Sequence, residues 1–130
     1  MPITPNDLIQ LAERWLEEDS SEATIRAAAS RGYYAAFHVC RELHHSICPI
    51  SVDEKIRPHK VIIDDFSNFA NNDADYSRKI NALGAMLKHA RSIRSQADYE
   101  LEDTFEKITA DQLLQTAKRI ISKISALPHN

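Results

Sequence analysis

The chain has 130 residues, of which 43% are hydrophobic and 27% charged, a composition typical of one globular domain. Two glycines and five prolines leave few places for tight β-turns or a glycine-rich phosphate loop, which disfavours an all-β fold and a nucleotide-cradling loop. The net charge of −3 argues against the indiscriminate nucleic-acid binding of a polycation.

The number of cysteines and the length of the apolar runs indicate the cellular compartment. The two cysteines, Cys40 and Cys48, are too few for a secreted disulfide scaffold. No signal-peptide pattern opens the chain, and no stretch reaches the roughly 18 apolar residues that a bilayer span requires. We therefore expect a cytoplasmic protein with no membrane segment, folded as one domain over residues 1–130.

The first two predicted helices are marked by caps and by apolar spacing. Thr4 caps a helix that begins at Pro5 and ends near Glu18 or Asp19. Ser20 and Ser21 offer the next cap, for a helix from Glu22 to about Ser46. The apolar stripe of this second helix consists of Ala29, Tyr33, Ala36, Phe37, Cys40, Leu43 and Ile47.

The rest of the chain predicts three further helices. Residues 48–57 are expected to be a connector, and Pro58 begins a third helix that turns Ile62, Phe66 and Phe69 inward. A fourth helix is expected from about Ala74 to Arg91–Arg94, and a capping box of Thr109 and Gln112 predicts the start of the last one. The predicted fold is an all-α antiparallel bundle of about five helices.

The second helix carries a line of polar residues away from its apolar stripe. Seven residues advance an α-helix by about 700°, so Arg31, His38 and His45 project in nearly one direction, almost opposite the predicted core. Ala27 and Ala35 are expected on the same far side, with Tyr34 beside them. Small residues there would allow a second subunit to approach closely.

This polar line has two interpretations. Arginine and histidine on the solvated side of an amphipathic helix are ordinary surface residues. They are also the groups that RNA cleavage needs, since a guanidinium pairs with phosphate oxygens and an imidazole moves protons near neutral pH. The pattern alone leaves both interpretations open.

Three patches of the sequence resemble the HEPN-domain family, in its branch of small stand-alone bacterial and archaeal members. The first is the run from Ser30 to His38, which is similar to the helix signature of that family. His59-Lys60 and then Arg94 with Ala97-Asp98-Tyr99 resemble two further patches in the expected order. The resemblance covers residues 30–99.

The resemblance implies a dimeric helical bundle that cuts RNA without a metal or other cofactor. In active members an arginine and a histidine from each subunit meet across the dimer, and Arg31 and His38 match the long form of that motif. Such proteins act as toxins beside a small nucleotidyltransferase antitoxin, or as RNA-cutting parts of antiviral systems. Other members are non-catalytic modules, so binding of a nucleotidyltransferase or a nucleotide is the alternative; Gly32 and the acidic net charge favour it.

Several other residues are candidates for supporting roles. Tyr34, His45, His59, Lys60 and Arg94 are assigned to RNA contacts, His59 and Lys60 because the first turn of a helix attracts anions. Asp98 and Tyr99 are expected to form a structural knot with Arg94 that closes one end of the bundle. No metal site is expected, because the adjacent His44 and His45 diverge by about 100° on a helix and no carboxylate stands at a suitable spacing.

Overall fold

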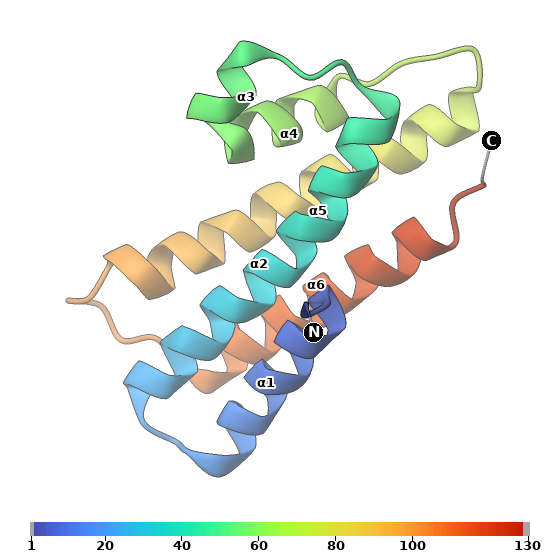
Figure 1. Ribbon diagram of the computed structural model, residues 1–130. Coiled ribbons are helices and arrows are strands. Elements are labelled where there is room, and N and C mark those ends of the chain that lie inside the picture. Colours follow the sequence, from blue (N-terminus) through green and yellow to red (C-terminus); the bar gives the residue numbers. More distant parts are fainter. Residues whose placement is uncertain (1, 129–130) are drawn as a thin grey trace.

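The computed structural model describes residues 2–128, which form six helices and contain no strand. Helix α2 runs through the middle of the molecule and packs against α1, α4, α5 and α6 (Figure 1). Helices α3 and α4 cover the end of the molecule where α2 finishes. The helix bounds are α1 Pro5–Glu18, α2 Glu22–Ile47, α3 Val52–Ile56, α4 Pro58–Ser67, α5 Ala74–Tyr99 and α6 Lys107–Ser125.

The predicted starts of the first two helices are confirmed. The backbone N–H of Asp7 donates to the Thr4 hydroxyl (3.3 Å), and the N–H of Thr4 donates to the Asp7 carboxylate (2.8 Å), which completes a capping box. Ser21 caps α2 by accepting the N–H of Thr24 at 3.3 Å. These contacts satisfy N–H groups that a helix start leaves without a partner.

The predicted stripe of α2 lies in the core, but the prediction for the opposite side of the helix is partly wrong. Ala35 is completely buried and Ala27 is half-buried. Gly32 is also buried, and a Cβ placed on it would overlap Cδ2 of Leu114 in α6. Gly32 therefore admits α6 of the same chain, because a central helix is covered on more than one side.

The expected connector contains a short helix, α3. Ser51 caps it by accepting the N–H of Glu54 at 3.3 Å, and the Glu54 side chain is buried. Five residues are too few to reveal a helical period, so only the cap was visible in the sequence. The next helix, α4, begins at Pro58 as predicted, with Ile62 and Phe66 buried and Phe69 partly buried.

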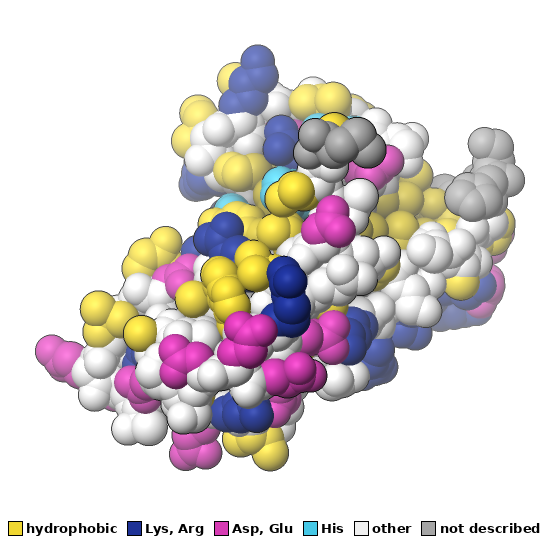
Figure 2. Space-filling model, turned by 60° about the horizontal axis from the view of Figure 1, so that its bottom comes forward, with side chains coloured by type: hydrophobic (Ala, Val, Ile, Leu, Met, Phe, Trp, Pro, Cys, Tyr) yellow, Lys and Arg dark blue, Asp and Glu magenta, His cyan; other side chains and the backbone are white. Residues whose placement is uncertain are grey.

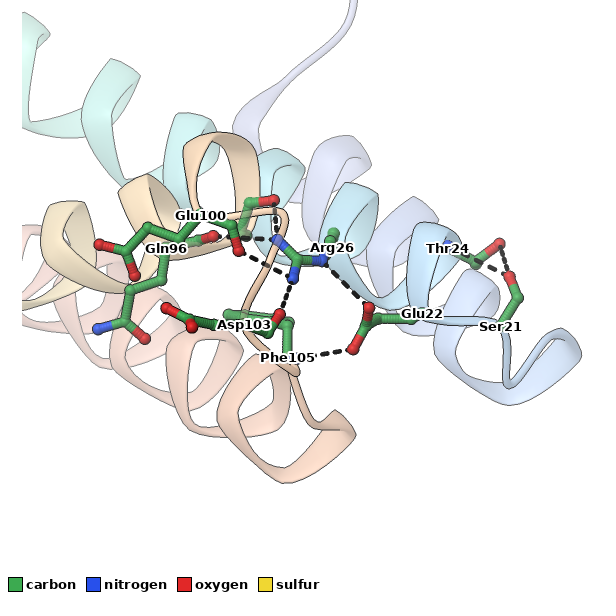
Figure 3. Close-up of polar contacts among 9 residues, drawn as sticks. Ser21, Glu22, Thr24, Arg26, Gln96, Glu100, Asp103 and Phe105 are labelled. Carbon is green, nitrogen blue, oxygen red and sulfur yellow. Dashed lines mark hydrogen bonds and ion pairs between the residues drawn. The ribbon is translucent and has the colours of Figure 1, made fainter.

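Helix α5 continues to Tyr99, past the predicted end at residues 91–94. The physical reason is Arg26 of α2, which is 8% exposed and lies against the last turn of α5 (Figure 3). Its guanidinium donates to four backbone carbonyls at and just beyond the end of α5, three of them at 2.9 to 3.2 Å, and so adds side-chain donors where the helical backbone donors run out. The four acceptors are Gln96, Ala97, Glu100 and Asp103.

The predicted capping box of the last helix is wrong. Helix α6 begins at Lys107, and its N-cap residue Glu106 makes no side-chain cap. The preceding Phe105 instead positions the helix, because this residue is buried and its N–H donates to the Glu22 carboxylate at 2.7 Å. Among residues 2–128, no helix combines the length and the apolar character needed to cross a membrane.

Candidate functional site

Four of the residues singled out in the sequence gather around a fifth, Tyr34. Above the half-buried ring of Tyr34 lie the guanidinium carbons of Arg31 (5.7 Å) and Arg94 (5.6 Å). The rings of His38 and His59 have their centres 6.4 and 6.1 Å from that of Tyr34. We call these residues, contributed by α2, α4 and α5, the Tyr34 cluster.

Arg31 and His38 are the exposed members of the Tyr34 cluster. Within residues 2–128, neither side chain has a hydrogen-bond or ion-pair partner. An arginine that is held only by an aromatic ring keeps its five N–H donors available for an anion. The exposed edge of the cluster therefore offers a cation and a proton-transfer group to a ligand.

Arg94 is the buried member of the Tyr34 cluster, with 6% of its surface exposed. Its guanidinium pairs with Asp98 at 3.5 Å, donates to the Tyr99 hydroxyl at 3.4 Å and lies 5.0 Å from the ring centre of Tyr33. The predicted contact of Asp98 and Tyr99 with Arg94 is thus confirmed. Tyr99 is 72% exposed, however, so its ring does not close the end of the bundle as we expected.

His59 is held as a neutral hydrogen-bond partner. The Tyr33 hydroxyl lies 2.6 Å from Nδ1 of His59, within hydrogen-bond distance, and burial raises the pKa of Tyr33, so its hydroxyl keeps its proton. Burial, followed by the charges of Arg94, Arg91 and His38, lowers the pKa of His59 to about 4. At neutral pH this residue offers a ring without positive charge.

Two predicted RNA contacts lie outside the Tyr34 cluster. Lys60 is exposed and pairs with Asp64 of its own helix at 2.6 Å. His45 uses Nε2 to contact the carboxylate of Glu54 at 2.8 Å. Both side chains are therefore engaged by acidic neighbours and are not part of the cluster.

The structure also adds two residues to the surroundings of the candidate site. The sequence patterns had assigned one of them to the core and had not singled out the other. Tyr33 was assigned only to the apolar stripe, yet it links α2 to α4 through His59. Arg91 lies close enough to His59 to lower its pKa. Its position three residues before Arg94, on the same side of a helix, was the only available signal.

Neither cysteine is a nucleophile at neutral pH. Cys40 is buried as predicted, and burial raises the pKa of its thiol to about 12. Burial and the charge of Asp65 also raise the pKa of Cys48. Side chains with the spacing to share a metal ion gather around His44, in a part of the described chain separate from the Tyr34 cluster.

Acidic and basic side chains are mixed on the surface, with acidic ones more frequent in one region. Acidic side chains gather in the lower part of the face drawn in Figure 2, while histidine side chains lie next to hydrophobic and basic ones nearer the middle. A groove of about 590 Å³ lies elsewhere, between the end of α2, the start of α5 and the end of α6. Because no charged residue of the Tyr34 cluster lines that groove, we place the candidate site at the cluster.

No known family matches the chain. Comparisons with protein-family models, with curated proteins and with solved structures each find nothing similar. What the Tyr34 cluster can do therefore follows from its own chemistry. It presents two guanidinium groups, a neutral imidazole and an exposed imidazole around an aromatic ring, which suits an anionic ligand that also carries a flat ring.

Proposed function

We propose that the protein is a metal-independent endoribonuclease of the HEPN type. The observation that carries the proposal is the exposure of Arg31 and His38 beside Tyr34, with no hydrogen-bond or ion-pair partner among residues 2–128. The three sequence patches that resemble HEPN proteins contain all five residues of the same cluster. RNA fits this surface because it combines phosphate charge with bases that stack on aromatic rings.

The reaction requires only proton transfer and charge stabilisation. The 2′-hydroxyl of a ribose attacks the adjacent phosphorus, and His38 accepts its proton as the new P–O2′ bond forms. Arg31 pairs with the non-bridging oxygens, where negative charge develops. The P–O5′ bond breaks, which leaves a 2′,3′-cyclic phosphate on one fragment and, after protonation, a 5′-hydroxyl on the other.

The departing 5′-oxygen needs a proton at the same time as the 2′-hydroxyl loses one. A single imidazole cannot accept one proton and donate another in one concerted step. A second copy of the chain, with its own Arg31 and His38 facing the first pair, supplies the missing acid. The proposed enzyme is therefore a homodimer with a composite site.

An RNase of this kind would suit the role of the toxin in a toxin–antitoxin system or of the RNA-cutting component in an antiviral system. A cytoplasmic RNase without a cofactor is harmful whenever it is free, so it requires a partner that restrains it. The HEPN resemblance points to a small nucleotidyltransferase as that antitoxin. Covering the exposed Arg31 and His38 would be sufficient for inhibition.

The first test uses purified protein, tRNA and mRNA in the presence of EDTA. Wild type should cleave RNA, and the new ends should carry 2′,3′-cyclic phosphates. His38→Ala and Arg31→Ala should each lower the rate at least about 100-fold, because each removes a group that acts on the transition state. Expression of the wild type alone should slow growth of the host cell.

The matched controls are His89→Ala in α5 and Arg119→Ala in α6, which change the same residue types at other exposed positions. Both controls should retain wild-type rates, and circular dichroism should show unchanged helix content in all four variants. The proposal fails if wild type cuts no RNA and harms no cell, or if His38→Ala cleaves as fast as wild type.

A second candidate function is a non-catalytic HEPN module that binds a nucleotidyltransferase or a nucleotide. Two observations favour it: the residue beside Arg31 is a glycine packed on Leu114, and no described side chain orients His38 by a hydrogen bond. A tight complex with the nucleotidyltransferase, together with no cleavage by either protein, would support this candidate. Arg31→Ala should then weaken the complex.

A further inference from the structure

Four titratable side chains form a second cluster at the junction of α2, α3 and α4. His44 is completely buried between two carboxylates, with Nε2 at 2.7 Å from Asp65 and Nδ1 at 3.0 Å from Glu54. The other oxygen of Glu54 contacts Nε2 of His45 at 2.8 Å. We call His44, His45, Glu54 and Asp65 the His44 cluster.

The contacts of His44 leave two buried atoms without a hydrogen bond. Nε2 bonds to the Asp65 carboxylate, so the proton of a neutral imidazole resides there and Nδ1 presents its lone pair. That lone pair lies 3.0 Å from Oε1 of Glu54, and neither atom has a hydrogen-bond partner among the described residues. Beside a neutral imidazole, two buried lone pairs are therefore in contact, and each atom also loses its hydration.

A divalent cation between these atoms would satisfy both at once. His44, His45 and Glu54 each offer one ligand atom within 4.8 Å of the others, and the contacts with Glu54 are made by Nδ1 of His44 at 3.0 Å and Nε2 of His45 at 2.8 Å. Ligand atoms about 2.1 Å from a tetrahedral Zn²⁺ are about 3.4 Å apart, so the ion fits after a small separation of the nitrogens from the Glu54 oxygens. The two carboxylates of the cluster balance its charge.

We propose that His44, His45 and Glu54 bind a zinc ion, with Asp65 as the carboxylate that orients His44. On binding, the proton between His45 and Glu54 moves from Nε2 to Nδ1 of His45, so that the neutral ring offers its Nε2 lone pair to Zn²⁺ and no proton is lost. The pairing of His44 with Asp65 is the arrangement in which a metal-bound histidine donates its other N–H to a carboxylate. A water molecule completes the four ligands of the ion.

A second triad around the same histidine, formed with Cys48 and Asp65, is geometrically close. It would use Nε2 of His44, which already has a good hydrogen bond to Asp65. Both atoms that lack partners lie on the opposite side of the imidazole. The contacts therefore favour the side of His45 and Glu54.

We expected no metal site at the adjacent His44 and His45 because we considered the geometry of one helix alone, without α3. The two rings diverge on α2, but they expose different nitrogens to the two oxygens of one carboxylate. Glu54 comes from a separate five-residue helix, so no motif spacing within α2 could reveal it. The proposed ion fastens α3 to α2, takes no part in RNA cleavage, and does not rest on the proposed function.

The test is titration of EDTA-treated, dialysed protein with ZnCl₂ by isothermal calorimetry, with the visible spectrum of Co²⁺ as a second readout. Wild type should bind one ion per chain, and Zn²⁺ should raise the melting temperature. His45→Ala and Glu54→Gln should each weaken binding at least about 100-fold, and Asp65→Asn about 10- to 100-fold. His45 is a suitable target because its side chain is 34% exposed, so its removal leaves the core intact.

His89→Ala and Cys48→Ser serve as controls and should bind Zn²⁺ like the wild type. No binding by the wild type would overturn the proposal, as would binding that survives both His45→Ala and Glu54→Gln. Loss of binding in Cys48→Ser with retention in His45→Ala would assign the ion to the other triad and also overturn it. Circular dichroism before titration ensures that each variant is folded.

Discussion

His59 illustrates how surroundings decide the role of a single residue. In the sequence it stands beside Lys60 at a helix start and looks like a cationic phosphate contact. In the structure it contacts the Tyr33 hydroxyl and packs on Phe37, with ring centres 4.2 Å apart. Burial and the neighbouring positive charges favour the neutral ring, so His59 contributes a polar but uncharged aromatic ring to the Tyr34 cluster.

The pH dependence of His59 follows from its lowered pKa. The folded-state pKa of about 4 lies below the usual value of 6.5, so the folded protein binds fewer protons than the unfolded chain between these pH values. The contribution of His59 to stability is complete above about pH 6.5 and declines as the pH falls toward 4. NMR of the imidazole carbons should show His59 titrating near pH 4.

An anion bound at the Tyr34 cluster would raise this pKa, because negative charge favours the imidazolium. Addition of a non-cleavable 2′-deoxy oligonucleotide should therefore move the His59 titration to higher pH in the wild type. The shift should be smaller in Arg31→Ala, which binds the anion less well. A His59 titration near pH 6.5 in the free protein would contradict the burial argument.

At the scale of elements, the end of α5 depends on α2. The sequence around residues 95–99 loses the apolar period, yet the helix continues, because Arg26 caps its last carbonyls from another helix (Figure 3). The same arginine lies 5.6 Å from the ring centre of Phe105, the residue that precedes α6. One buried side chain thus sets both the end of α5 and the path into α6.

Replacement of Arg26 should destabilise this junction strongly. Arg26→Ala removes the donors to four carbonyls, and we expect it to lower the free energy of unfolding by about 3 kcal/mol. Arg26→Lys should recover only part of the loss, because an ammonium group does not span the same acceptors. Urea denaturation measures the change, and hydrogen exchange should show earlier opening at residues 95–99.

Arg78→Ala is the matched control, since Arg78 is exposed on the same helix that Arg26 caps and makes only a surface ion pair with Asp75. Its effect should stay within about 0.5 kcal/mol. Equal effects of Arg26→Ala and Arg78→Ala would show that the carbonyl contacts do not hold α5.

At the scale of the whole molecule, the proposed reaction requires two chains. Of the small residues of α2 that we expected to receive a second subunit, Ala35 is buried and Ala27 half-buried within the single chain, and the nearby Gly32 packs on α6. The proposed dimer would therefore form around the exposed edge of the Tyr34 cluster, where Arg31 and His38 lie. Tyr99, which contacts Arg94, is 72% exposed, and Leu101, two residues further along the chain, is 71% exposed.

Sedimentation equilibrium should therefore give twice the chain mass of 14.8 kDa under the conditions in which RNA is cleaved. Leu101→Asp should weaken the dimer and lower cleavage together, because the exposed leucine follows the end of α5 and takes no part in the chemistry. Ile108→Asp, at an exposed position of α6, is the control and should change neither. An active monomer would contradict the composite site.

The sequence by itself determined the helical class, the caps of α1 and α2, and the exposure of Arg31 and His38, because these depend on neighbours within a few turns. The sequence did not predict where α5 ends or that α3 exists. It also did not predict the contact of His59 with Tyr33 or that of Glu54 with the two adjacent histidines. Those features depend on contacts between helices distant in the chain. Only contacts between helices decide whether an arginine caps a helix end or faces a ligand. The same contacts decide whether a histidine is charged.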